Sequence, residues 1–438
     1  MRYMFLKLNL VANLLLFESF VKTDIIHKGN KNSEAVEIRG NQIRKLSDDD
    51  GGYMKIYYNS AASYTNGFYN INRQNIAYII NGDSDTHISD SEAFTVSAGS
   101  QIEVHFNTRP NALDSFFDKD WDGQATKIVS IDLSHLDTSS LSTMKNMFNG
   151  CSSLESIDFS NFITSSVTNM AYLFYGCKNL ISINLSNFIT SSVTTMKQMF
   201  FKCSSLVSID LSNFITSSLT DMDGMFLGCS NLKSLNLANI ITSSVTTMNQ
   251  MFYGCSSLES IDLSNFITSS VTIMDQMFFG CSSLKSIDLS NFNTLKLNSM
   301  ESMFQGCSSL ESIDLSNFIT SSVTTMAKMF YGCTKLKSIN LTNFDTSSLN
   351  TMSQMFYGCS QIKSIDLSKL DASFVTTMYQ MFFQCKSLES IDFSNFITFS
   401  VTNMEGMFNE CNKLKSINLT SFITSSVTTM KYMFYRCR

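Results

Sequence analysis

The stretch that decides the fold is residues 255–280, which read CSSLESIDLSNFITSSVTIMDQMFFG. Its cysteine recurs every 26 residues, in one series of twelve from Cys151 to Cys437. Close copies of the stretch fill residues 125–438 as twelve units without insertions or deletions; only the first unit lacks the cysteine, and Cys437 and Arg438 follow the last unit. A constant period of this length is typical of a solenoid or propeller, in which stacked units bury an apolar face that one unit cannot bury alone.

Each unit contains two apolar patterns. Residues 260–264 alternate polar and apolar side chains, which is the period of a half-buried strand. After a serine pair that could cap a helix, residues 271–281 place apolar side chains at helical spacing. One strand and one short helix per unit, with L-x-x-L-x-L spacing, is the leucine-rich-repeat pattern. The sequence therefore predicts an α/β solenoid: a leucine-rich-repeat array of twelve 26-residue coils, with a parallel sheet on one face and short helices on the other.

The methionines and cysteines mark columns in the core. The position of Met274 is Met in all twelve units, that of Met277 in eleven, and that of Phe278 is Phe in all twelve. Stacked coils turn these positions into internal columns, where flexible Met packs between rigid rings. No two cysteines are closer than 26 residues, whereas zinc sites need pairs at short spacing, so we expect buried free thiols.

Residues 125–438 resemble the repeats of the BspA-like leucine-rich-repeat surface proteins, including the related mycoplasma-type repeat family. The resemblance lies in the run L-x-S-I-D-L-S-N-F-x-T-S-S-V-T-x-M-x-x-M-F-x-G-C, which twelve units share. It implies a secreted or cell-surface, non-enzymatic protein that binds other cells, matrix proteins or neighbouring surface molecules. It transfers no catalytic residues and covers nothing before residue 125.

The part before the array divides into three segments. Residues 1–21 hold a short apolar stretch after two basic residues and are expected to be a signal peptide; no apolar run is long enough to span a bilayer. Residues 22–52 are polar and predict a flexible linker. Residues 53–124 predict a β-rich N-terminal cap domain, with strands at 53–58, 76–80 and 101–106. This domain either covers the first coil or carries a ligand site of its own.

A candidate calcium site lies between the cap and the first coil. Asp118, Asp120 and Asp122 precede Gly123 in the D-x-D-x-D-G spacing of calcium loops. The twelfth position is Val129 instead of the usual glutamate, so a solvated acidic junction is the alternative. No other cofactor is expected.

A row of acidic side chains is expected on the sheet face. Eight units have Asp at the position of Asp262 and four have Asn. The row is either a solubilising face, balanced by a neighbouring column of mixed Lys and Glu, or a shallow polar groove for a protein or an extended glycan. The candidate ligand-binding residues are Asp158, Asp210, Asp262, Asp288, Asp314, Asp366 and Asp392.

A second stripe follows the invariant phenylalanine. It is either packing between neighbouring coils or an aromatic strip on which sugars or a partner stack. Its candidate residues, which we call the aromatic strip, are Tyr175, Phe201, Tyr253, Phe279, Tyr331, Tyr357 and Phe383.

The predicted function is binding through these surfaces, because the sequence contains few features typical of an enzyme. The net charge of −6 gives no basic footprint for nucleic acid, no phosphate loop or nucleophile elbow is present, and His135, the one histidine in the array, has no evident nucleophile beside it. We expect a secreted or cell-surface protein that mediates adhesion by binding a protein or glycan on a cell or matrix surface. Two alternatives stay open: an intracellular interaction scaffold, whose free thiols suit a reducing compartment, or a structural protein that binds calcium or a repetitive surface through the Ser/Asp ladder.

Overall fold

The structure, a computed structural model, describes residues 36–39, 42–45, 51–64, 76–81, 86–88, 93–117, 124–341 and 343–437. The chain divides into two compact units, Met1–Asp48 and Asp49–Arg438. In the first unit, β1 (Val36–Arg39) and β2 (Gln42–Lys45) form an antiparallel hairpin within the range for which a linker is predicted. The predicted signal peptide and the aspartates of the predicted calcium loop lie outside the described residues.

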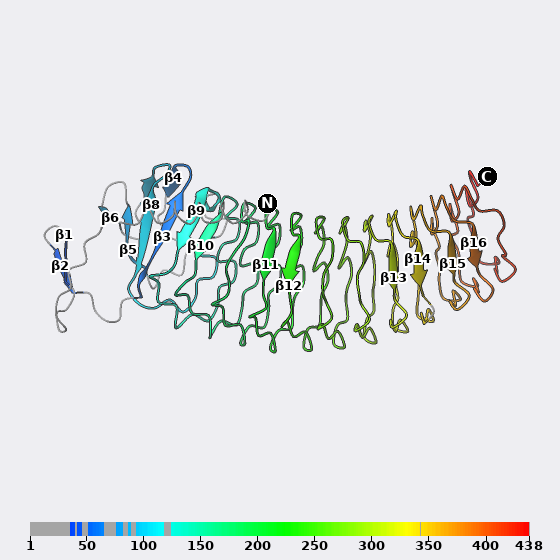
Figure 1. The fold of residues 1–438 in the computed structure, drawn as a ribbon, viewed down its shortest axis with the longest axis horizontal. Coiled ribbons are helices and arrows are strands. Elements are labelled where there is room, and N and C mark those ends of the chain that lie inside the picture. The colour runs from blue at the N-terminus through cyan, green and yellow to red at the C-terminus, as the bar shows by residue number, and fades with distance from the viewer. Residues whose placement is uncertain are drawn as a thin grey trace, which may run out of the picture. The chain divides into compact units, whose positions relative to one another are not determined.

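The second unit contains a solenoid of stacked coils, which run side by side from the cyan to the red end of the ribbon in Figure 1. Strands of neighbouring coils pair in parallel with a register of one repeat, as Ile157 does with Ile131. The predicted solenoid and its parallel sheet face are therefore confirmed. The strands of the coils are β9 (Ile128–Asp132), β10 (Ser156–Asp158), β11 (Ser208–Asp210), β12 (Ser234–Asn236), β13 (Ser312–Asp314), β14 (Ser338–Asn340), β15 (Ser364–Asp366) and β16 (Ser390–Asp392).

The short helices predicted opposite the sheet do not form in the described part of the chain, where residues 271–281 contain an isolated bridge at Ile273 and turns at 275–280. Each coil has two residues in the left-handed region here, such as Gln276 (φ 57°) and Gly280 (φ 70°), and these interrupt a right-handed helix. Alternate N–H groups bond to the next coil instead of to their own, as Phe278 N–H does to the Met303 carbonyl at 2.9 Å. The one helix in the described ranges is the 3-10 turn η2 (Gln124–Lys127), and none is long and apolar enough to cross a membrane.

The β-rich segment before the array extends the sheet of the first coils. Its strands at 53–58, 76–81 and 101–106 confirm the three predicted ones, and the sheet has the order β10-β9-β3-β8-β5-β6. β3 pairs antiparallel with β9, so the first coil has no open sheet edge on that side. The strands are β3 (Tyr53–Tyr58), β4 (Ala62–Tyr64), β5 (Ile76–Asn81), β6 (Thr86–Ile88), β7 (Phe94–Val96) and β8 (Gln101–Phe106), with β4 paired to β7.

The core consists of like residues in columns. The invariant phenylalanine rings stack from Phe148 to Phe434, and Phe117 of the cap continues the stack, with centroids 5.3 to 5.8 Å apart. All twelve cysteines are free and eleven are buried, as predicted. Each thiol donates to the carbonyl of a phenylalanine in an earlier coil or the cap, as Cys281 does to Phe252 at 3.2 Å. Desolvation raises the pKa of Cys281 to about 12, so the thiols behave as small apolar residues.

A ladder of buried threonines joins neighbouring coils. The hydroxyl of Thr242 accepts a hydrogen bond from Ile267 N–H at 2.7 Å and donates to the Ile267 carbonyl at 2.9 Å. The same reciprocal pair recurs along the array, and these threonines are at most 1% exposed. Ala372 replaces the threonine in one coil, so Ile397 lacks this hydroxyl partner. The ladder therefore has one gap within the array.

Candidate functional site

The aspartates of the sheet face accept hydrogen bonds from the backbone of the turn that follows each of them. Ser264 N–H donates to Asp262 Oδ1 at 2.9 Å, and each of the seven candidate aspartates accepts the same bond at 2.8 or 2.9 Å. This bond is the main cause of the lowered pKa of Asp262. Asn236 accepts the equivalent bond, which explains why Asn and Asp interchange in the row. All seven are exposed, so one carboxylate oxygen holds the turn and the other faces solvent.

Ion pairs across coils balance the charge beside this row. Lys285 Nζ lies 2.6 Å from Glu259 Oε2, and Lys337 Nζ lies 2.7 Å from Glu311 Oε2. All four side chains are more than half exposed, so the pairs add little stability. Over the middle coils, the face thus presents serine, turn-forming aspartate and charges that neutralise each other.

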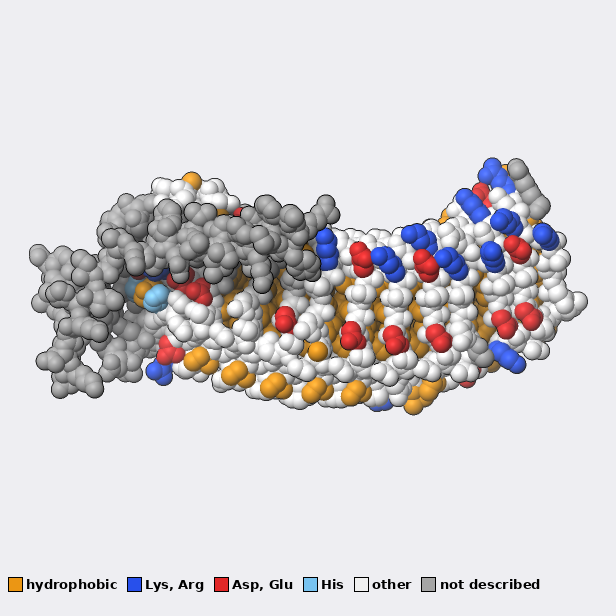
Figure 2. Space-filling view, in the orientation of Figure 1, with side chains coloured by type: hydrophobic (Ala, Val, Ile, Leu, Met, Phe, Trp, Pro, Cys, Tyr) orange, Lys and Arg blue, Asp and Glu red, His pale blue; other side chains and the backbone are white. Residues whose placement is uncertain are grey.

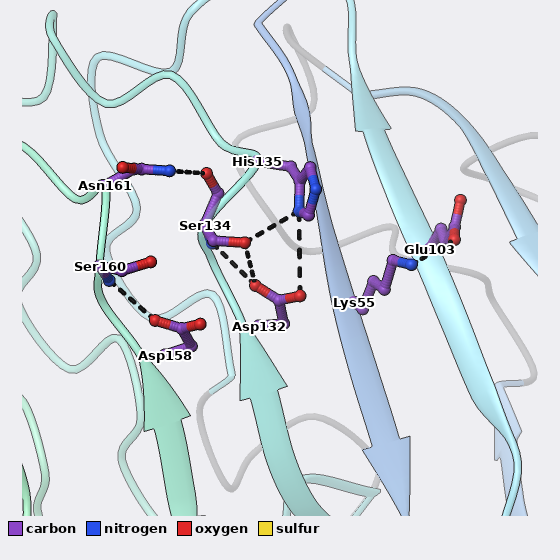
Figure 3. Close-up of polar contacts among 8 residues, drawn as sticks. All are labelled: Lys55, Glu103, Asp132, Ser134, His135, Asp158, Ser160 and Asn161. Atoms are coloured by element: carbon purple, nitrogen blue, oxygen red, sulfur yellow. Dashed lines mark hydrogen bonds and ion pairs between the residues drawn. The ribbon is translucent and has the colours of Figure 1, made fainter. Parts of the chain in front are cut away.

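Where the sheet face reaches the cap, it carries both acidic and basic side chains. Across four strands, Asp158, Asp132, Lys55 and Glu103 lie opposite one another in register (Figure 3). Lys55 Nζ is 3.3 Å from Glu103 Oε1, so both signs of charge meet within one patch. Positive charge here interrupts a row that is acidic or neutral throughout the coils.

A stack of three rings stands beside these charges. The Tyr53 ring lies between His105 and His135, with centroids 4.9 and 4.6 Å away. Register places His105 opposite Tyr53 on β8, and Tyr53 N–H donates to the His135 carbonyl at 3.1 Å. The hydrogen bond with His105 is the main cause of the lowered pKa of Glu103. We call Tyr53, Lys55, Glu103, His105, Asp132 and His135 the junction cluster.

A serine that the sequence analysis overlooked lies against His135. Ser134 Oγ is 2.9 Å from His135 Nδ1 and donates to Asp132 Oδ1 at 2.6 Å (Figure 3). Asp132 Oδ2 lies 3.8 Å from the same ring nitrogen. A Ser-His-Asp relay needs serine and aspartate on different nitrogens of the imidazole. This geometry therefore orients the ring and does not activate the serine.

The aromatic strip stacks on itself. Tyr253 and Phe279 are 4.3 Å apart and parallel within 3°, and Tyr357 stacks between Tyr331 and Phe383 at 4.4 and 4.7 Å. Tyr175 and Phe201 form a third stack, and all seven rings are half-buried. Neighbouring rings cover the faces on which a sugar would stack, leaving free faces at the ends of each stack. The arrangement favours packing between coils.

The structure adds an apolar surface that the sequence analysis missed. Isoleucine follows the inward Phe266 and precedes the buried Thr268, so alternation turns Ile267 outward at 48% exposure. This alternation of inward and outward side chains is the sequence pattern from which the apolar surface could have been predicted. From the coil of Cys151 onward, eight of eleven coils have an exposed isoleucine here, and Leu295, Phe374 and Phe399 are exposed two or three residues further along their coils, as hydrophobic side chains along the lower border of Figure 2 illustrate. We call this set the isoleucine edge: Ile163, Ile189, Ile215, Ile241, Ile267, Leu295, Ile319, Phe374, Ile397, Phe399 and Ile423.

Among the described residues, no group of three or more His, Cys, Asp or Glu side chains could hold a metal ion. The calcium candidates Asp118, Asp120 and Asp122 lie outside those residues. Calcium binding there stays a prediction.

Comparison with known proteins gives a family for the array. The model described as "Mycoplasma protein of unknown function, DUF285" matches residues 113–240, 228–343, 257–366 and 325–438. No curated protein matches the chain.

Three solved structures are similar to the chain. TLR13 in a complex with ssRNA13 has 17% identity and a TM-score of 0.26, over 64% of this chain and 45% of that one. The Drosophila Toll–Spatzle complex has 15% identity and a TM-score of 0.30, over 68% and 43%. An LRR protein of Leptospira interrogans has 14% identity and a TM-score of 0.26, over 67% and 81%. The chain spans less than half the length of the first two.

Proposed function

The chain belongs to the family described as "Mycoplasma protein of unknown function, DUF285", and from this premise we propose that it is a secreted or cell-surface solenoid that binds a partner protein through its sheet face. The junction cluster is the observation that carries the proposal. It combines a ring stack, both signs of charge and partial exposure on a continuous six-stranded sheet. Tyrosine on a rigid scaffold is typical of binding hot spots.

A protein partner fits this cluster better than a glycan does. Both faces of Tyr53 are covered by His105 and His135, so the cluster offers ring edges, imidazole nitrogens and charges rather than a platform for sugars. The aromatic strip is similarly covered within its stacks. Complementary charged and polar groups on a partner protein would match the junction cluster.

The thiols are compatible with export. Burial raises the pKa of the eleven cysteines from Cys177 to Cys437, and eleven of the twelve thiols are buried. Thiols held neutral and inaccessible resist oxidation, so the array needs no reducing compartment. The predicted signal peptide at 1–21 and the resemblance to BspA-like surface proteins point the same way.

Binding is tested with the full chain against immobilised matrix proteins and glycans by surface plasmon resonance. We expect a matrix protein to bind, and His135→Ala to weaken that binding by at least about tenfold, the effect of losing a hot-spot side chain. His135 is a suitable target because its side chain is 48% exposed and its loss spares the core. Tyr331→Ala, in the aromatic strip, is the control and should leave affinity unchanged. Binding to glycans alone, or sensitivity to Tyr331→Ala alone, would contradict the proposal.

Export is tested separately by protease shaving of intact cells and mass spectrometry. We expect release of peptides from residues 125–438 and a mature N-terminus that lacks the first twenty or so residues. Release only after lysis, with Met1 retained, would support the intracellular alternative.

A further inference from the structure

The isoleucine edge contains a strip without charge over its first five coils. Five consecutive coils, from Ile163 to Ile267, each expose an isoleucine at 42% to 52%. The ten residues around it in each coil, such as 159–168 and 263–272, include no Asp, Glu, Lys, Arg or His. The flanking asparagines are already bonded to the previous coil, as Asn213 Nδ2 is to the Ser186 carbonyl at 3.0 Å. Covering this strip therefore buries apolar surface without stranding a charge.

We propose that the strip is the interface of a homodimer, in which two copies of the chain pack antiparallel, edge to edge, about a two-fold axis at Ile215. In this arrangement Ile215 meets Ile215 of the second copy. Ile189 meets Ile241, and Ile163 meets Ile267. The contact is isologous, as expected for a closed dimer. It lies apart from the junction cluster and does not depend on the function proposed above.

The spacing of the isoleucines along the array favours a second copy of the chain as the partner that covers the strip. Isoleucines recur once per coil, and hydrogen-bonded coils stack about 4.8 Å apart. A helix presents a side chain about every 5.4 Å and falls out of step by about 2.4 Å over five coils. One face of an extended strand repeats at about 6.8 Å and diverges faster. Another copy has the same rise, so all five rows stay matched.

Charge at the two ends of the strip selects the antiparallel orientation. Asp137 occupies the isoleucine position one coil before Ile163, and Lys296 lies one coil after Ile267. Antiparallel packing places the Asp137 coil opposite the Lys296 coil at both ends. Parallel packing would place like charges opposite each other, which costs affinity. Asp137 also pairs with Arg109 at 2.6 Å, which offsets part of the charge of its carboxylate.

A pocket beside the two-fold axis can receive side chains of the second copy. Its volume is about 650 Å³ and its lining includes Ile215, Ala238, Ile240 and Ile241. Ala238 and Ile240 replace the Ser and Phe of the usual repeat, which leaves the space. The two-fold axis presents one such pocket to each copy, so side chains from the opposite edge fill both.

The contact area is that of a weak dimer. The five isoleucines, at 42% to 52% exposure, present roughly 450 Å² per copy, against roughly 800 Å² per partner in a standard interface, and the flanking Ser and Asn rows add polar area to the contact. We therefore expect a Kd in the micromolar range.

Sedimentation equilibrium of the full chain at up to about 100 µM tests the interface, since this exceeds the expected Kd. The wild type should approach twice the 49.1 kDa mass of one chain. Ile215→Lys sets two ammonium groups together on the axis and should weaken association at least about 100-fold. Ile319→Lys, on the same edge but outside the strip, should not. Circular dichroism confirms that both variants fold, which their exposed positions favour. A monomeric wild type, or a dimer that withstands Ile215→Lys, would overturn the proposal.

Oxidative cross-linking tests the orientation. Ile215→Cys should form a disulfide with its own copy on the axis. Ile189→Cys should cross-link to Ile241→Cys in a mixed sample and not to itself. Self-cross-linking of Ile189→Cys would refute the antiparallel arrangement.

Discussion

Removing one hydroxyl from the threonine ladder tests what joins the coils. Thr242 is fully buried, and its hydroxyl bonds both backbone groups of Ile267 in the next coil. Thr242→Val keeps the shape of the side chain and its burial. The substitution therefore deletes two hydrogen bonds without opening a cavity.

The expected cost follows from the groups left behind. A buried N–H without an acceptor costs about 1–3 kcal/mol, and the Ile267 carbonyl also loses its donor. Because Ile267 is 48% exposed, its backbone groups are not deeply buried, and we take the middle of this range, about 2 kcal/mol. In a stacked array this loss falls on the contact between two coils. A loss of about 2 kcal/mol raises the equilibrium constant for local opening of this contact about 30-fold, since about 1.4 kcal/mol corresponds to a factor of ten.

Hydrogen exchange followed by mass spectrometry measures this opening coil by coil. Peptides that contain Ile267 should exchange about 30-fold faster in Thr242→Val, at roughly 1.4 kcal/mol per tenfold. The matched control is Thr246→Val in the same coil, where an exposed hydroxyl donates to the Thr220 carbonyl at 3.3 Å. Water replaces that bond, so exchange should hardly change. Equal effects of the two substitutions, or none from Thr242→Val, would refute the role given to the ladder.

Three further predictions concern the gap in the ladder and the thiols. Ala372→Thr supplies the missing hydroxyl opposite Ile397 and should stabilise that contact by about 1 kcal/mol; faster exchange around Ile397 would contradict this. Iodoacetamide at pH 8 should modify only the half-buried Cys437 in the native protein and all twelve cysteines in urea; rapid native labelling of Cys281 would show that the column is accessible. The pKa of Cys281 rises from 9.0 to about 12 on folding, so thiolates form first in the unfolded chain. The urea midpoint should therefore be constant between about pH 7 and pH 9, above the titration of the carboxylates, and fall between pH 9 and 12, and a flat profile to pH 11 would contradict the burial.

The repeat period predicted the stacking and its core, because every coil has the same length and its like residues must meet. The helices were wrong for a local reason. Inward residues at spacings of three and four also arise from consecutive turns, and left-handed residues such as Gln276 are not distinguished by an apolar pattern. The three longest strands within residues 53–106 were predicted because their apolar pattern is local, whereas the three-residue strands β4, β6 and β7 are too short to give such a pattern.

The candidate surfaces were predicted less completely. The aspartate row and the aromatic strip follow directly from stacking, but the turn bond of Asp262 and the ring stacks depend on side-chain positions. The junction cluster depends on β3 pairing with β9, more than seventy residues later in the chain, which a single sequence does not reveal. Ile267 was visible in the alternation but was overlooked beside the more prominent aromatic pattern.

The gap at Ala372 has a consequence for how the protein responds to force. Coils stacked in series carry the same tension, so a pull along the solenoid acts on every contact equally and the weakest one opens first. The contact that lacks the paired hydroxyl bonds lies between the coil of Ala372 and that of Ile397. A released coil of 26 residues extends to about 90 Å from a stacked rise of about 5 Å. We therefore expect that, under tension, the contact between the coils of Ala372 and Ile397 opens before the neighbouring contacts that keep both hydroxyl bonds.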